Sequence, residues 1–240
     1  MEPVIIYEDS DLVCVSKPSG MLIHPTNKNE SLTLADWIKD KYPEMNGVGE
    51  PAILSNGEKV SRPGIVHRLD KETSGVVCLA KNEKSYLNLK QQFQNRKVEK
   101  IYNAFLYGVP EIKKDTINVH IGRAKGAPTK RATGDMSRGK QRESITDYEV
   151  LNFWDNKYSF VEARPKTGRT HQLRVHFKHI GNPIVCDKLY APKKSCVLGF
   201  SRLALHARSI SITDMKGARI IVETDLPDDF KKALINANNL

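Results

Sequence analysis

The sequence predicts an α+β fold in one domain. Strand-like runs cluster along the chain without regular alternation with helices, which argues against a doubly wound parallel sheet. Hydrophobic residues make up 39% of the 240 residues, enough for a substantial core. No internal repeat or long linker divides the chain, so we expect residues 1–240 to fold as one unit.

The N-terminal region begins with a predicted β-hairpin. Residues 3–7 and 12–17 alternate or run apolar, and the polar stretch 8–11 between them suits a turn. Apolar residues at helical spacing then predict a short helix over 32–42. Ser31 precedes it and is a residue type that commonly caps helix N-termini.

The next elements are a loop, a strand and a helix. Residues 43–63 are rich in Gly, Pro, Asn and Glu and are expected to form a surface loop. The continuous apolar run 75–80 predicts a buried strand. Residues 82–95 carry apolar side chains at helical spacing, and Asn82 is placed to cap that helix.

A strand over 99–108 opens the second half of the chain. Residues 122–142 are basic, contain glycine and have few large apolar side chains, so we expect a mobile loop there. Two further strands are expected over 145–153 and 158–164, where apolar and polar residues alternate.

The C-terminal elements are a mixture of helices and strands. Residues 170–180 fit either a helix or a strand, and Thr170 as a cap favours the helix. Strands are expected over 203–212 and 218–224. Pro227 stands where a final helix can begin.

The charge of the chain favours a polyanionic partner. The net charge is +10 and the pI is about 9.4. Basic residues concentrate in 81–100 and in 123–142. They form either two solvated faces or a groove that follows phosphates, and charge alone leaves both interpretations open.

Other classes of protein are poorly supported. No run approaches the roughly 20 apolar residues of a membrane span, and the acidic N-terminus lacks the features of a signal peptide. We therefore expect a cytoplasmic protein that does not contact membranes. Cys14 and Cys78 lie in apolar stretches and are expected to be buried, and the cysteine spacing supports neither a zinc site nor a disulfide framework.

The segment from Pro63 to Val77 is the most informative stretch. It contains His67-Arg68-Leu69-Asp70, with charged groups placed directly before a buried strand. Spacing alone leaves a structural loop as the more frequent explanation. Protein kinases, P-loop proteins and zinc deaminases are excluded, because their glycine, Asp-Phe-Gly or Pro-Cys-x-x-Cys signatures are missing.

The whole segment resembles the second motif of the RluA family of pseudouridine synthases, His-Arg-Leu-Asp-x-x-Thr-Ser-Gly. Further stretches resemble this family in order and spacing: Lys17-Pro18-Ser19-Gly20, Lys100-Ile101-Tyr102-Asn103-Ala104, Gly168 to His176, Gly181 to Asp187, and Arg202 to Ala207. Cys186 departs from the pattern, because the family usually has glycine there. The resemblance covers roughly residues 5–230.

The resemblance implies a fold and a reaction. The fold is a single catalytic domain on a long, bent, mixed but mostly antiparallel sheet with flanking helices. The first motif begins at residue 17, so the additional N-terminal RNA-binding domain of many relatives is expected to be absent. The reaction breaks the N1–C1′ bond of uridine, rotates the uracil and rejoins it to C1′ through C5, which requires neither a cofactor nor a metal. The expected partner is ribosomal or transfer RNA, bound by a monomer.

The resemblance also assigns roles to residues. Asp70 is the essential carboxylate, acting on C6 or C1′ or assisting a glycal route. Arg174 is its expected ion-pair partner. Tyr102 stacks on uracil or helps to remove the C5 proton. Arg68 occupies the space that the flipped uridine leaves. RNA contacts or loop-orienting roles are expected for the remaining site residues: His67, Thr73, Arg169, His171 and Lys17.

Two alternative functions differ from RNA isomerisation. The same scaffold can serve a non-catalytic RNA-binding protein, although an intact set of Asp70, Tyr102 and Arg174 argues against it. A uracil-releasing glycosylase would share the nucleophile and the flipping step but would liberate free uracil. The histidines His67, His171 and His176, with His179 one helical turn beyond His176, invite a metal site, but no acidic residue stands at ligand spacing.

Overall fold

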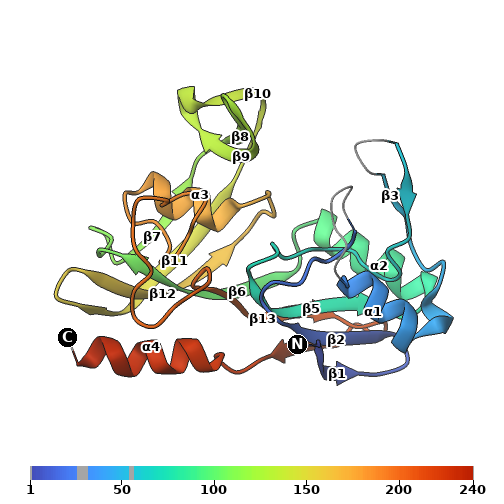
Figure 1. Cartoon of the computed structure of the whole chain (residues 1–240). Coiled ribbons are helices and arrows are strands. Elements are labelled where there is room, and N and C mark those ends of the chain that lie inside the picture. Colours follow the sequence, from blue (N-terminus) through green and yellow to red (C-terminus); the bar gives the residue numbers. More distant parts are fainter. Residues whose placement is uncertain (1, 26–31, 54–56, 240) are drawn as a thin grey trace. The chain divides into compact units, whose positions relative to one another are not determined.

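The computed structural model describes residues 2–25, 32–53 and 57–239 (Figure 1). The chain divides into two compact units. Unit 1 contains Met1–Val98 and Ser209–Thr224, and unit 2 contains Glu99–Arg208 and Asp225–Leu240. Both units combine strands with helices, which confirms the α+β class.

A β-sheet forms the centre of unit 1. In order across the sheet its strands are β1 (Val4–Glu8), β2 (Leu12–Lys17), β5 (Ser74–Ala80) and the second half of β13 (Leu205–Thr213), which also pairs with β14 (Arg219–Glu223). The predicted hairpin and the buried strand are confirmed, and every residue of β5 is buried. Alternate apolar side chains such as Leu12, Val76 and Ile210 form the core on one face.

Two helices complete unit 1. Helix α1 (Leu34–Lys41) begins later than predicted, because Thr33 and Asp36 form a reciprocal capping box. The predicted cap Ser31 lies outside the described residues. Helix α2 (Glu83–Gln94) is capped by Asn82 as predicted and packs on β5.

Short elements occupy the predicted loop over 43–63. They are a 3₁₀ turn at Pro43–Met45 and a hairpin of β3 (Ala52–Ile53) and β4 (Lys59–Val60). The following Gly64 has φ +67°, and a Cβ atom there would lie 2.2 Å from the carbonyl oxygen of Ala80. Only glycine fits this approach, which carries the chain from the hairpin to the motif segment.

A β-sheet also forms the centre of unit 2. It contains, in order, the first half of β13, β6 (Glu99–Tyr107), β12 (Tyr158–Pro165), β11 (Ile145–Trp154) and β7 (Lys114–Asn118). Strand β7 was not predicted, because Ile117 is the one apolar residue of its polar sequence. The ring of Phe105 packs among the rings of Phe160, Phe200 and Phe230 and centres the core.

Helices α3 (Gln172–His179) and α4 (Asp228–Asn238) belong to unit 2. Pro227 is the N-cap of α4, as the sequence indicates. The N-cap of α3 is His171 with φ 58°, and the expectation of Thr170 is wrong because the chain enters this helix through a left-handed residue. Helix α3 packs on β12 and on β9, a strand of the small sheet described next.

The expected mobile loop over 122–142 is instead a three-stranded antiparallel sheet. Its strands are β8 (Ile121–Ala124), β9 (Ala127–Thr133) and β10 (Ser137–Arg142), with β8 in the middle (Figure 1). Most side chains of β10 are exposed, so the strand carries no hydrophobic alternation. The prediction failed because this sheet is polar and basic rather than amphipathic.

A disulfide joins Cys186 to Cys196, contrary to the sequence-based expectation. Cys186 has φ 59°, a left-handed conformation that glycine adopts most easily. The glycine that the family resemblance leads us to expect here would adopt this backbone without strain. Cys14 and Cys78 are buried as expected and face each other across β2 and β5.

The helices of the described ranges are short, and none combines the length and apolar character needed to cross a bilayer.

Candidate active site

The loop that carries Asp70 leads directly into β5 of unit 1. Leu69 is 5% exposed and anchors the loop in the core, whereas Arg68 is exposed and Asp70 is half-buried. The amide of Thr73 donates to the carbonyl of Asp70 at 3.1 Å and closes a turn. Exposed and buried residues alternate along this loop. Arg68 is therefore accessible to a ligand, whereas its neighbour Leu69 is fixed by packing.

The segment Lys17–Gly20 braces this loop. The Lys17 ammonium is fully buried and donates to the carbonyl of Lys71 at 3.2 Å and to that of Met21 at 2.9 Å. The amide of Gly20 donates to the same Lys71 carbonyl at 2.8 Å, and the Ser19 hydroxyl donates to the carbonyl of Glu72. Burial of the Lys17 ammonium among carbonyls gives it a positioning function, and its predicted contact with RNA stays a prediction.

His67 and Thr73 are also held within unit 1. Nε2 of His67 accepts a hydrogen bond from the amide of Cys78 in β5 at 2.9 Å. The imidazole stacks on Phe93 of α2 with 4.6 Å between ring centroids. Thr73 is 2% exposed. These contacts orient the loop, and the RNA contacts expected of both residues remain predictions.

Strand β6 of unit 2 carries Lys100 and Tyr102. Because side chains alternate along a strand, these two residues share one face of the sheet. Tyr102 is half-buried and pairs with Ala163 of β12. Burial lowers the pKa of the Lys100 ammonium to about 8, and its Nζ lies 3.5 Å from the carbonyl oxygen of Thr167.

Gln172 fixes the turn that precedes α3. Its Oε1 accepts from the amide of Arg169 at 2.9 Å and from the Thr167 hydroxyl at 2.8 Å. Its Nε2 donates to the carbonyl of Ile145 and to the Thr146 hydroxyl of β11. This buried amide therefore ties the turn to the sheet. The Arg169 guanidinium is held in addition, because its Nε donates to the carbonyl of Glu143.

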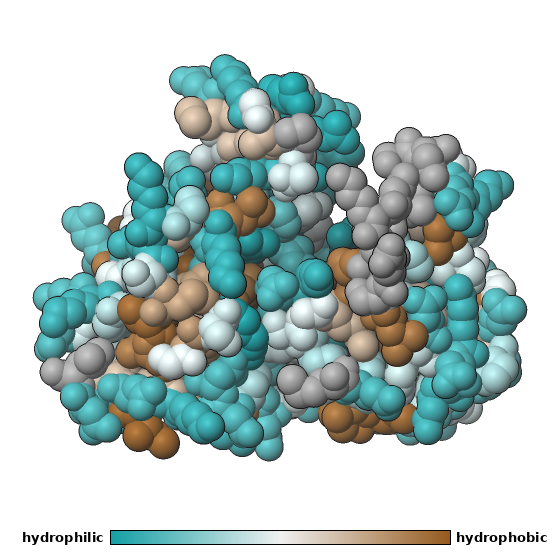
Figure 2. Space-filling model, in the orientation of Figure 1, coloured by the Kyte–Doolittle hydropathy of each residue, from teal (hydrophilic) through white to brown (hydrophobic). Residues whose placement is uncertain are grey.

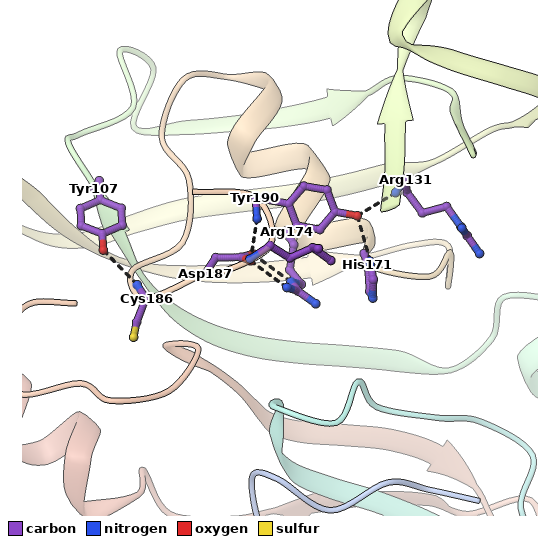
Figure 3. A network of polar contacts seen from close by, with 8 residues as sticks. Tyr107, Arg131, His171, Arg174, Cys186, Asp187 and Tyr190 are labelled. Carbon is purple, nitrogen blue, oxygen red and sulfur yellow. Dashed lines mark hydrogen bonds and ion pairs between the residues drawn. The ribbon is translucent and has the colours of Figure 1, made fainter. Parts of the chain in front are cut away.

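Arg174 forms a buried two-bond ion pair with Asp187 (Figure 3). Nε and Nη2 of Arg174 donate to Oδ2 and Oδ1 of Asp187 at 2.8 and 2.7 Å. The two residues are 8% and 1% exposed. The predicted partner Asp70 belongs to unit 1, so that pairing stays a prediction. Asp187 engages two of the five N–H donors of the guanidinium.

Tyr190 connects Arg174 to His171 and to β9 (Figure 3). Its ring lies 5.1 Å from the Arg174 guanidinium carbon. Its hydroxyl accepts from the amide of Arg131 and lies 2.8 Å from Nδ1 of His171. Its own amide donates to Oδ1 of Asp187. One side chain thus couples the ion pair, the start of α3 and the small basic sheet.

Sequence reasoning missed the parts played by Asp187, Tyr190 and Gln172. Asp187 ends the stretch Gly181 to Asp187, which resembles the family, but the resemblance implies no role for it. The available signal was Arg174 itself: a guanidinium in a predicted core helix requires a carboxylate partner. Tyr190 and Gln172 gave no comparable signal, because neither carries a charge that demands compensation.

The histidines of α3 do not form a metal site in the part of the chain that the structure describes, where no three potential ligands gather. His176 is fully buried and its Nε2 lies 2.8 Å from the Ser144 hydroxyl. Burial, with a smaller contribution from the charge of His179, lowers the pKa of His176 to about 4. It is therefore a neutral core residue at pH 7.

Comparison with known proteins identifies the family. Residues 11–179 match the family model described as RNA pseudouridylate synthase. An uncharacterised RNA pseudouridine synthase of Bacillus subtilis is 35% identical over 237 residues, which cover 98% of this chain and 73% of that protein. Ribosomal large subunit pseudouridine synthase D of Zymomonas mobilis is 31% identical, covering 98% of this chain and 74% of that protein.

A solved structure agrees with the sequence matches. Human RNA pseudouridylate synthase domain containing 4 superposes with a TM-score of 0.76 at 26% identity, covering 98% of this chain and 93% of that one. The family model spans both the Asp70 loop and the Arg174 helix. The chain therefore belongs to the RluA-type family of RNA pseudouridine synthases, which are isomerases that act on RNA.

Proposed function

We propose that this chain isomerises uridine in ribosomal RNA and that Asp70 is the carboxylate that acts on the reacting nucleotide. The observation that carries the proposal is the construction of the Asp70 loop. Leu69 anchors the loop, the Lys17–Gly20 segment braces it, and the Asp70 side chain is still half-exposed. A braced loop that presents one carboxylate suits a group that must meet a substrate in a fixed geometry.

Arg174 and Tyr102 complete the proposed site from unit 2. The Arg174 guanidinium is fixed by Asp187, so it can stabilise an ionised Asp70 without first losing side-chain freedom. Tyr102 offers an aromatic face for uracil and a hydroxyl near the C5 proton. We propose that both units form one catalytic domain over residues 1–240, with Asp70 paired to Arg174.

Arg68 is proposed to fill the space left by the flipped uridine. Its side chain is exposed, whereas its neighbours in the loop are anchored. Extruding a base costs a few kcal/mol of lost stacking, and a planar guanidinium in the vacated stack offsets part of that cost. Arg68→Ala is therefore expected to reduce kcat more than RNA binding.

Tritium release tests the reaction. A C5-tritiated transcript of large-subunit ribosomal RNA loses tritium to water when pseudouridine forms, because C5 becomes the glycosidic carbon. Wild type should release tritium, and Asp70→Asn should not, although it should bind the transcript normally. Glu72→Gln is the matched control, because Glu72 is an exposed carboxylate in the same loop. Equal release by the Asp70→Asn variant would remove Asp70 from the mechanism.

Product analysis separates the rival functions. A glycosylase would liberate free uracil and leave an abasic site, which chromatography detects directly. A non-catalytic RNA-binding protein would bind the transcript without releasing tritium or uracil. Pseudouridine formation instead leaves the mass of the RNA unchanged. The modified position keeps its carbodiimide adduct through alkaline treatment, whereas unmodified uridines lose theirs.

The proposed setting is a monomer that acts on RNA in the cytoplasm. Ribosomal RNA is preferred because relatives from Zymomonas mobilis and Pseudomonas aeruginosa are named ribosomal large subunit pseudouridine synthase D. Transfer RNA is the second substrate to test. Light scattering of the purified chain at assay concentration checks the monomer, and a dimer mass would contradict it.

A further inference from the structure

The small sheet of unit 2 borders a basic cavity of about 480 Å³. The cavity lies between the strands β8 to β10 and the turn Gly168–Thr170. Hydrophilic side chains cover much of the small sheet in Figure 2. Of the described residues that line the cavity none is acidic, and six are cationic: Arg123, Arg131, Arg138, Lys140, Arg142 and Arg169.

Three of these arginines form a row across the sheet. Arg123 of β8 is the register partner of Arg131 on β9 and of Arg138 on β10. Neighbouring strands lie about 4.8 Å apart, so the row spans roughly 10 Å. Like charges at directly opposite positions destabilise a sheet. The chain thus brings three guanidinium groups together on one face of the small sheet.

Phosphate is the anion that best suits this lining. Guanidinium groups bind phosphate oxygens through two parallel hydrogen bonds, and several in a row can hold successive phosphates of one strand. Arg123 and Arg138 are exposed, so a polymer can reach them without opening the fold. A polar, cationic lining of this kind differs from the largely apolar pockets that take small organic ligands.

The cavity is linked mechanically to the Arg174 ion pair. The backbone amide of Arg131 in β9 donates to the Tyr190 hydroxyl at 2.8 Å, and Tyr190 also contacts Arg174 and His171 (Figure 3). Tyr190 is therefore the single residue that connects β9, which lines the cavity, to the proposed catalytic arginine. Both features lie within unit 2.

We propose that this cavity is a dedicated site for backbone phosphates of the RNA strand that carries the target uridine. The inference rests on the proposed function and adds a defined binding site to it. Backbone pairing in the small sheet sets the register of Arg123, Arg131 and Arg138, so the three guanidinium groups start from fixed positions on the strands. Binding there positions the RNA by its backbone and does not depend on base identity.

The double variant Arg123→Gln/Arg138→Gln tests the site. Its binding to a fluorescein-labelled oligouridylate is followed by anisotropy across a salt series. Each lost contact to a single strand lowers the log–log salt slope by about 0.7, so the slope should fall by about 1.4 and affinity at 0.1 M salt by roughly 25-fold. The control is Lys231→Gln/Lys232→Gln, which removes two exposed charges from α4 and should leave both quantities unchanged.

Thermal unfolding adds an independent readout. Relief of the repulsion between opposed arginines should leave the Tm of the double variant equal to or above that of wild type. An unchanged salt slope overturns the inference, as does an equal loss of affinity in the Lys231/Lys232 control. A lowered Tm with unchanged affinity would show that the row is structural.

Tritium release separates this inference from the proposed function. If wild type isomerises uridine and the double variant binds RNA as wild type does, the phosphate site is refuted and the enzymatic function stands. If the cavity charges govern RNA binding and wild type releases no tritium, the phosphate site stands and the proposed function fails. Asp70→Asn should keep the wild-type salt slope in either case.

Discussion

The buried pair between Arg174 and Asp187 should contribute strongly to stability. Asp187→Ala would leave a guanidinium that is 8% exposed without its carboxylate, at a cost of about 3–5 kcal/mol in the free energy of unfolding. It would also remove the acceptor for the amides of Leu189 and Tyr190. Arg174→Ala should cost less, about 3 kcal/mol, because the Asp187 carboxylate keeps those two backbone donors.

A double-mutant cycle measured by urea unfolding isolates the pair. Two strongly coupled partners should give an interaction free energy of about 2–3 kcal/mol. The matched control is the pair Lys166–Asp147 of the same unit, whose Nζ–Oδ2 distance is 3.1 Å but whose side chains are 55% and 34% exposed. It should give less than about 1 kcal/mol. Equal coupling in the two cycles would refute the argument from burial.

Three further perturbations have defined outcomes. Acidification from pH 7 to pH 5 should reduce the free energy of unfolding by about 2 kcal/mol through His176, because its pKa is about 4 in the folded chain and about 6.5 in the unfolded chain, which binds the proton first. Burial also lowers the pKa of His206 to about 4, so His176→Gln should weaken the pH dependence in urea titrations without abolishing it, and an unchanged slope would contradict the assignment. Carbon-labelled lysine side chains observed by NMR should show Lys100 titrating near pH 8, and a midpoint near the ordinary value of about 10.4 would show that its burial has little effect. Reduction of the Cys186–Cys196 disulfide should lower kcat for tritium release, because the loop that it closes contains Asp187, the ion-pair partner of Arg174. A Cys196→Ser variant should be insensitive to reductant. Equal sensitivity of both proteins would rule out the disulfide as the cause.

The elements that could be predicted are those with a strong hydrophobic period. The buried run at 75–80, the amphipathic helix at 82–95 and the hairpin at 3–17 were all found, because their apolar residues face a core. The basic sheet over 122–142 could not be found this way. Its strands are held by backbone pairing and their side chains serve solvent or a ligand, so propensity and periodicity both indicate a loop.

The proposed site also contains residues that the sequence makes recognisable and contacts that only the folded chain reveals. Asp70, Tyr102 and Arg174 stand in segments that the family resemblance makes recognisable. The Asp187 partner of Arg174 and the Tyr190 bridge depend on contacts between residues separated along the chain. In the sequence, Cys186 is visible only as a departure from the glycine that the resemblance implies. Its left-handed backbone and its bond to Cys196 become visible only when the loop from Cys186 to Cys196 is folded.

Whether cysteine or glycine at position 186 gives the more stable fold depends on the oxidation state of the Cys186–Cys196 bond. A left-handed backbone costs a cysteine roughly 1–2 kcal/mol relative to glycine. Closing a loop with a sequence separation of 10 restricts the unfolded chain enough to contribute about 3 kcal/mol. Cysteine therefore gives a higher free energy of unfolding than glycine while the disulfide is intact, and a lower one once the disulfide is reduced. The turn that carries Asp187 is consequently most rigid under oxidising conditions, and glycine would be the superior residue in a strongly reducing compartment.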